Sequence, residues 1–134
     1  MNNQQRKESK NLFHKYTNSW IQKDLDTFLS LLAGDVLVIE CFGASYRGKK
    51  ECKQWFSHWN ANHENQVLSW ETINHFHDAL LEVSIIDWDF IYRYKGEENS
   101  FVGLTVLKVE NGKITYIREY EAKKTTYRPF EQLE

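Results

Sequence analysis

Residues 80–94 read Leu-Leu-Glu-Val-Ser-Ile-Ile-Asp-Trp-Asp-Phe-Ile-Tyr-Arg-Tyr. β-Branched and aromatic residues dominate this stretch, and such residues favour a pleated strand. Two acids, Asp87 and Asp89, stand at its centre on either side of Trp88. Successive side chains of a strand point to opposite faces, so both carboxylates share one face and Trp88 occupies the other. We expect the fold to be arranged around this strand.

Three more strand-like runs surround it in the chain, at residues 67–76, 100–110 and 113–123. The last two are joined by Asn111-Gly112, a pair that tolerates positive φ and is a strong signal for a tight hairpin. The second half of the chain is therefore predicted to be an antiparallel meander.

The first half is predicted to be mainly helical. Residues 4–22, 25–33 and 49–61 each carry apolar side chains at the spacing of one helix face. Asp24 is a suitable N-cap for the second helix. Residues 36–41 form a short β-rich run between the helices.

This order indicates an α+β domain, residues 1–134, in which three N-terminal helices pack on one face of a curved antiparallel sheet. The run Phe-Val-Gly-Leu-Thr-Val-Leu at 101–107 is apolar on both of its faces. A sheet covered on one side only would alternate more clearly. We therefore expect a homodimer that packs through the sheet.

The chain has 134 residues and a net charge of −2, which gives no electrostatic reason to expect binding to nucleic acid or to an anionic membrane. Its beginning, residues 1–10, is polar, and no run is long enough to span a bilayer. Two cysteines, Cys41 and Cys52, do not make a disulfide framework. A cytoplasmic protein with reduced thiols is the expectation.

Several short motifs share their order with a known family. They are Asp24-Leu25-Asp26, Trp55-Phe56-Ser57-His58-Trp59-Asn60, Asp87-Trp88-Asp89-Phe90, Ser100-Phe101-Val102-Gly103, and Gly112-Lys113-Ile114 leading to Arg118-Glu119-Tyr120. On these residues the chain resembles the SnoaL-like branch of the nuclear-transport-factor-2-like superfamily, which has a cystatin-like fold. The resemblance covers almost the whole chain.

The resemblance implies a cone-shaped α+β fold in which a curved sheet and helices enclose one deep pocket, usually in a dimer. Relatives include polyketide cyclases, ketosteroid isomerase, epoxide hydrolases and dehydratases, which share acid–base chemistry by carboxylates or histidines and need no cofactor. Other relatives are binding or adaptor modules. Two further hypotheses therefore stand beside an enzyme: a non-catalytic pocket for a small apolar ligand, and a protein-interaction module.

Asp87 and Glu119 are the candidate catalytic residues. In a meander, their strands flank the strand between them, so the two acids are expected on one face. An apolar cavity raises the pKa of a carboxyl toward the range useful for proton transfer at neutral pH. The alternative is that these acids face solvent or pair with arginines across strands. The acid face should look into the pocket, and the face of Trp88, Phe90 and Tyr92 toward the dimer partner.

The chain is rich in rings, with five Trp, seven Tyr and eight Phe. Large rings either fill a core or line a ligand pocket, and Trp and Tyr favour sites that are partly wet. The pocket for a small apolar ligand is predicted to include Tyr16, Trp20, Glu40, Trp55, Trp59, Trp70 and Asp89.

His75 and His77 share one face of a predicted strand, an arrangement that binds zinc or iron when a carboxylate joins it. They lie next to a turn, where polar side chains are ordinarily solvated. We therefore predict no metal site and no cofactor.

Overall fold

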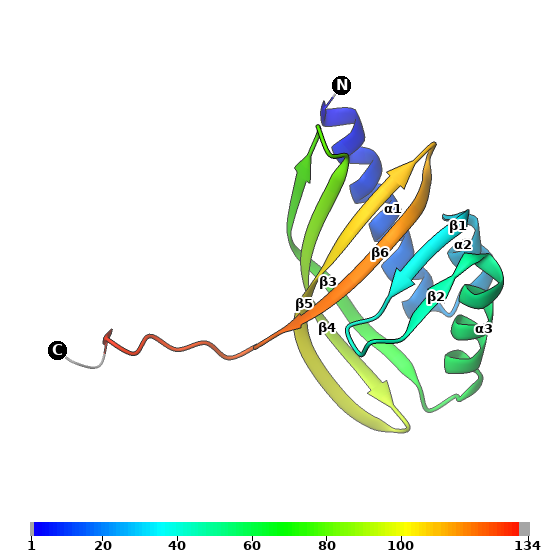
Figure 1. The fold of residues 1–134 in the computed structure, drawn as a ribbon. Helices are drawn as coiled ribbons and strands as arrows, with labels where there is room; N and C mark the ends of the chain where they lie inside the picture. The colour runs from blue at the N-terminus through cyan, green and yellow to red at the C-terminus, as the bar shows by residue number, and fades with distance from the viewer. Residues whose placement is uncertain (1, 132–134) are drawn as a thin grey trace.

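A computed structural model describes residues 2–131. Its helices are α1 (Asn2–Gln22), α2 (Leu25–Ser30) and α3 (Gly48–Ala61). Its strands are β1 (Leu32–Ile39), β2 (Ser45–Arg47), β3 (Gln66–Asp78), β4 (Val83–Tyr94), β5 (Glu97–Glu110) and β6 (Lys113–Ala122). One sheet contains all six strands, in the order β2-β1-β6-β5-β4-β3 (Figure 1).

The predicted α+β class and the predicted meander are both confirmed, because β3, β4, β5 and β6 pair antiparallel in chain order. Two features of the sheet were not predicted. The strand β1 runs parallel to β6, and the short strand β2 pairs with β1 inside a segment that reads as a connector. These additions extend the sheet beyond β6 and bring the β1–β2 turn beside it.

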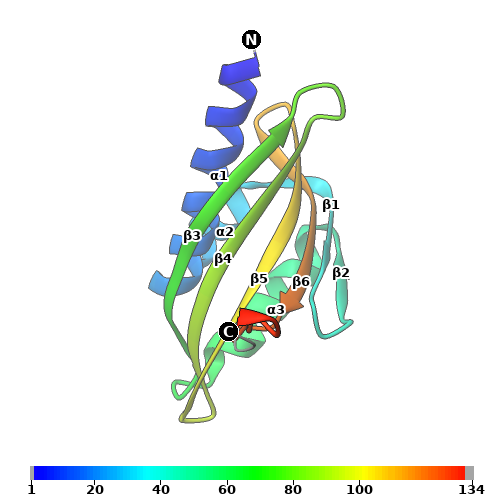
Figure 2. The same ribbon diagram turned by 90° about the vertical axis from the view of Figure 1, so that its left-hand side faces the viewer.

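The sheet bends around the helices, and irregularities in its ladders mark where it bends. The register shifts twice between β3 and β4, once between β5 and β6, and once between β1 and β6. An extra residue on one strand kinks that strand and increases its twist. Figure 2 shows the long strands β3–β6 in front of α2 and α3, so the helices lie on one side of the sheet. We call the helix-covered side the inner face and the other side the outer face.

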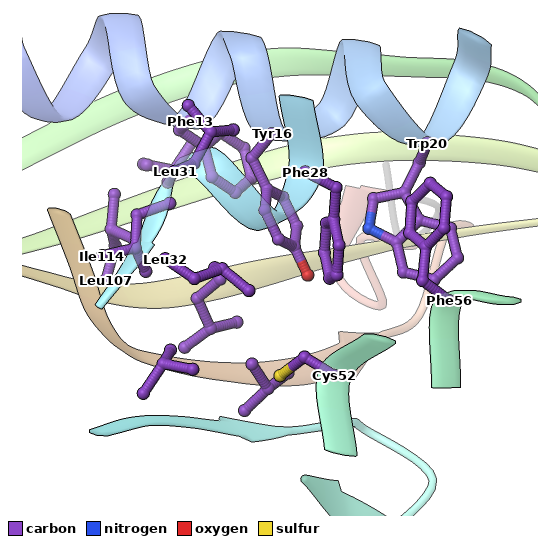
Figure 3. Packing of buried hydrophobic residues seen from close by; sticks show 14 of the residues in the cluster. Phe13, Tyr16, Trp20, Phe28, Leu31, Leu32, Cys52, Phe56, Leu107 and Ile114 are labelled. Atoms are coloured by element: carbon purple, nitrogen blue, oxygen red, sulfur yellow. The ribbon is translucent and has the colours of Figure 1, made fainter. Parts of the chain in front are cut away.

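The core lies between α1, α2, α3 and the inner face. Phe13, Tyr16 and Trp20 recur along one side of α1, and all three are buried. Phe28 of α2 packs between Tyr16 and Trp20, with ring centroids 5.7 and 5.5 Å away (Figure 3). The stripe predicted for the third helix is also confirmed, since Cys52 and Phe56 are buried. Helical periodicity therefore identified the core side of each helix.

Several element boundaries differ from the predictions, among them those of β1, which spans Leu32–Ile39 rather than residues 36–41. The central strand begins at Val83 rather than at residue 80, because Leu80 and Leu81 lie in the β3–β4 turn and are 96% and 71% exposed. The helix α2 ends at Ser30 rather than at residue 33. Its predicted N-cap is confirmed, because the Asp24 carboxylate accepts a hydrogen bond of 3.1 Å from the Thr27 backbone N–H.

None of the helices in residues 2–131 is both long and apolar enough to cross a bilayer.

Candidate functional site

A cavity of about 80 Å³ lies between the helices and the inner face of the sheet. Every tryptophan of the chain lines it: Trp20 from α1, Trp55 and Trp59 from α3, Trp70 from β3 and Trp88 from β4. Phe42 also lines the cavity and is 67% exposed, so the cavity opens to solvent beside the β1–β2 turn. Two acids, Glu40 and Glu119, complete this aromatic wall.

Glu119 lies on β6 opposite Thr105 of β5, a residue with no exposed surface. The side chain is partly exposed where it opens on the cavity, and its carboxyl is deeply buried among the lining residues. Burial, and secondarily the charge of Glu40, raise the pKa of Glu119 to about 8. No basic group or hydrogen-bond donor of the described residues offsets this effect. The Glu119 carboxyl thus has access to both protonation states near neutral pH.

Glu40 follows directly after β1, and the turn that contains it directs its carboxyl into the cavity. Burial raises its pKa, while a hydrogen bond from Tyr46 opposes that rise. The Tyr46 hydroxyl donates to Glu40 Oε1 at 2.8 Å, and its ring stacks on Trp55 at 4.5 Å. A hydrogen bond therefore fixes the position of the Glu40 carboxyl, whereas the Glu119 carboxyl has no such bond among the described residues.

The prediction of which side chains of the central strand face the pocket is wrong. Trp88 is 1% exposed and lines the cavity, with Phe90 and Tyr92 beside it on the inner face. Asp87 lies on the outer face, where its carboxylate accepts a 2.7 Å hydrogen bond from the Asn74 backbone N–H. Burial of the apolar Trp88 ring stabilises the core, whereas burial of the Asp87 carboxylate without a partner would cost several kcal/mol.

Two residues predicted for the pocket also lie elsewhere. Asp89 shares the outer face with Asp87, and Lys124 pairs with it at 3.3 Å. Tyr16 is fully buried in the core and does not line the cavity. Its hydroxyl lacks a hydrogen-bond partner among the described residues, and burial, with the charge of Glu119 as a lesser cause, raises its pKa.

Other predicted pocket residues do line the cavity, namely Trp20, Glu40, Trp55, Trp59, Trp70 and Glu119. Sequence reasoning did not place Cys41, Phe42, Val67, Phe90, Tyr92 and Phe101 there. The alternation of side chains along a strand could have identified two of them. Phe90 and Tyr92 follow the buried Trp88 at steps of two and therefore share its face. Cys41 is no nucleophile candidate, because burial and three neighbouring carboxylates raise the pKa of its thiol to about 12.

The two histidines of β3 have separate environments. His77 Nδ1 lies 2.8 Å from the Ser84 hydroxyl, and its Nε2 lies 3.3 Å from Gln5 Oε1. Both ring nitrogens of His75 are buried without a partner in the part of the chain that the structure describes, and burial, followed by the charge of Arg6, lowers its pKa to about 4. Within residues 2–131 no three potential metal ligands come together.

Comparison with known families agrees with this architecture. The sequence profile of the SnoaL-like domain matches residues 13–117. The chain therefore belongs to the SnoaL-like family, with the cone-shaped fold of the nuclear-transport-factor-2-like superfamily. No curated protein sequence matches the chain.

Solved structures of low sequence identity share the fold. A candidate isomerase from Bacillus subtilis has a TM-score of 0.77 at 12% identity, with 88% of each chain covered. An LEH-like epoxide hydrolase from M. tuberculosis has a TM-score of 0.75 at 16% identity, covering 87% of this chain and 79% of its own. A candidate polyketide cyclase from Xanthomonas campestris has a TM-score of 0.70 at 17% identity, with 96% of each chain covered. At these identities the likeness shows the fold alone.

Proposed function

We propose that the cavity binds a small, largely apolar molecule and that Glu119 exchanges a proton with it. The observation that carries this proposal is a carboxyl with a pKa of about 8 that faces an aromatic cavity and lacks a partner among the described residues. General acid–base catalysis is most efficient when the pKa of the catalytic group lies near the working pH. The protonated form of Glu119 donates, and the ionised form accepts.

Glu40 is the second carboxyl of the proposed reaction. Each charge disfavours the other, so the two groups titrate apart and provide one acid and one base. The Tyr46 hydrogen bond opposes the rise that burial causes in the pKa of Glu40, whereas no hydrogen bond of the described residues opposes the rise for Glu119, so we take Glu119 as the proton carrier. Asp87 and Asp89 have no place in this proposal, because both lie on the opposite face of the sheet from the cavity.

The reaction class that fits such a pair is isomerisation, cyclisation, dehydration or hydrolysis without a cofactor. The relatives described as an isomerase, an epoxide hydrolase and a polyketide cyclase lie within this range. Isomerisation, cyclisation and dehydration require proton transfer inside an apolar site, and hydrolysis requires in addition a water molecule, which can enter through the opening beside Phe42. The carboxyls of the cavity supply the proton transfer, and its rings supply the apolar site.

The test is a turnover screen with small cyclic ketones and epoxides, repeated for Glu119→Gln and for Glu110→Gln as a matched control. Glu110 is exposed at the end of β5. General acid–base catalysis contributes about 10²- to 10⁴-fold, so Glu119→Gln should lower kcat by at least ~10²-fold while Glu110→Gln leaves it unchanged. Full turnover by Glu119→Gln would refute the proposed role of this carboxyl.

A non-catalytic binding site is the second candidate. Its support is the mainly aromatic lining of the cavity, which suits an apolar ligand whether or not a proton is exchanged. Under this alternative, molecules from the screen stabilise the folded protein without being converted. Thermal shift measured beside turnover separates the two, because a ligand that binds only the folded state raises Tm in either case.

We also propose that the protein is a homodimer that packs through the outer face. Apolar side chains remain exposed there, with Phe76 at 59%, Ile85 at 41% and Tyr120 at 45% exposure. Between them lie Val102, Leu104 and Val106 of β5, which point to the same side. Sedimentation at micromolar concentration should give a dimer, and Ile85→Glu should shift it toward monomer. A wild-type monomer under these conditions would contradict the proposal.

A further inference from the structure

The wall of the cavity has an unusual charge character. Nine of its thirteen lining residues are aromatic and two are glutamates. No lysine, arginine or histidine of the described residues lines it. The face of an aromatic ring carries negative potential, and cations bind over that face within about 6 Å of the centroid. Rings and carboxylates therefore both favour positive charge in the same space.

The rings surround the space from several directions, although Phe90 and Tyr92 stack with their planes at 21°. The plane of Trp70 crosses those of Trp88 and Phe90 at 82° and 61°. The planes of Trp88 and Phe101 cross at 65°, and those of Trp20 and Trp59 at 76°. Rings set at steep angles around one volume form a cage, the arrangement that suits a compact cation.

The indole N–H groups do not weaken this cage. The nitrogens of Trp20 and Trp70 are buried, without a partner in the residues described. The Trp88 N–H donates to Thr105 Oγ1 at 2.9 Å, which turns it from the cavity. Because its N–H is occupied, Trp88 offers ring carbons and no donor to a ligand.

We propose that the ligand carries a compact positive charge, a methylated ammonium group, held among the rings with Glu119 as its counter-ion. This inference rests on the proposal that the cavity is the ligand site, and it specifies the chemical class of the ligand. Methyl groups on the nitrogen spread the charge and match an apolar wall. The remainder of the molecule would extend toward the opening at Phe42.

Binding should be linked to proton release. The ionisable groups around Glu119 are Tyr16 of α1, Glu40 and Cys41 after β1, and Tyr46 of β2. Tyr16, Cys41 and Tyr46 all have raised pKa values and stay neutral below pH 9. A cation beside Glu119 favours its ionised form, so it binds more tightly as pH rises toward 8, by at most about tenfold per pH unit, and no further above that. An anionic ligand would show the opposite slope.

Choline and 3,3-dimethylbutan-1-ol provide the test, because they have the same shape and differ only in the charge of the central atom. Their affinities are measured by calorimetry and by quenching of tryptophan fluorescence at pH 6 and pH 8.5. At pH 8.5 choline should bind at least tenfold more tightly than the alcohol. Glu119→Gln should remove most of this preference, and Glu110→Gln should behave as wild type.

Equal or weaker binding of choline relative to the alcohol would overturn the inference and leave the proposed apolar pocket standing. Failure of choline to bind at millimolar concentration would also overturn it. A preference for choline that survives in Glu119→Gln would exclude this carboxyl as the counter-ion, and the inference would be wrong in that respect. The turnover screen above does not depend on any of these results, so the two proposals fail separately.

Discussion

Replacing Glu119 with glutamine should stabilise the folded protein at alkaline pH. In the wild type the unfolded carboxyl ionises near its ordinary pKa of 4.5, whereas the folded carboxyl ionises at about 8. One pKa unit corresponds to about 1.4 kcal/mol, so the ionised group destabilises the fold by roughly 3 to 5 kcal/mol. Glutamine has nearly the same shape and no charge. The free energy of unfolding of Glu119→Gln at pH 9 should therefore exceed that of the wild type by this amount.

The stability advantage of Glu119→Gln should grow as pH rises. A raised folded pKa means that the folded state holds its proton more strongly than the unfolded state. The contribution of Glu119 to stability is thus complete below pH 4.5 and is lost as pH rises to about 8. Urea unfolding at pH 5, 7 and 9 should show the advantage of Glu119→Gln growing across this range. The exposed control Glu110→Gln should show no such growth, and a constant advantage for Glu119→Gln at all three values would contradict the account.

Gly103→Ala should be strongly destabilising, although it adds one methyl group. A Cβ at this position would lie 2.3 Å from the Tyr120 carbonyl oxygen and 2.8 Å from Trp88 Cη2. The carbonyl belongs to the neighbouring strand and cannot move without breaking the β5–β6 ladder. Overpacking of a core typically costs about 1 to 3 kcal/mol, and we expect Gly103→Ala to reach the upper end of this range. Equilibrium unfolding in urea measures it.

Gly34→Ala is the matched control, because an added Cβ there meets nothing within 4 Å. That variant should keep the stability of the wild type. Gly103→Ala should also change the tryptophan fluorescence, since Trp88 is pushed toward the cavity. Equal stability of the two alanine variants would contradict the close packing of Trp88 against Gly103 of β5.

The sequence predicted the core and most elements because these depend on local patterns. Helical spacing identified Phe13, Tyr16 and Trp20 as one apolar side, and the pair at 111–112 identified the last hairpin. Glu119 and Glu40 were predicted as site residues, and both line the cavity. The short strand β2 escaped prediction because only its pairing with β1 makes it a strand.

The placement of Asp87 and Glu119 on opposite faces could not be predicted because it depends on a single irregularity. In an unbroken ladder from the Asn111-Gly112 turn, Glu119 would oppose Leu104, which opposes Asp87 on β4. The register shift beyond Val109 moves Glu119 by one residue, to oppose Thr105. One residue reverses the face of every later side chain in a strand. Glu119 therefore points inward while Asp87 points outward.

Direct titration of the Glu119 carboxyl tests the central claim most directly. Carbon-13 NMR of glutamate side-chain carboxyls, recorded from pH 4 to pH 10, reports each group separately, and the signal missing from Glu119→Gln identifies the residue. We predict that this signal titrates with a midpoint near pH 8. A midpoint near the ordinary value of 4.5 would mean that the carboxyl is solvated or paired, and it would contradict both the proton-exchange role and the buried counter-ion.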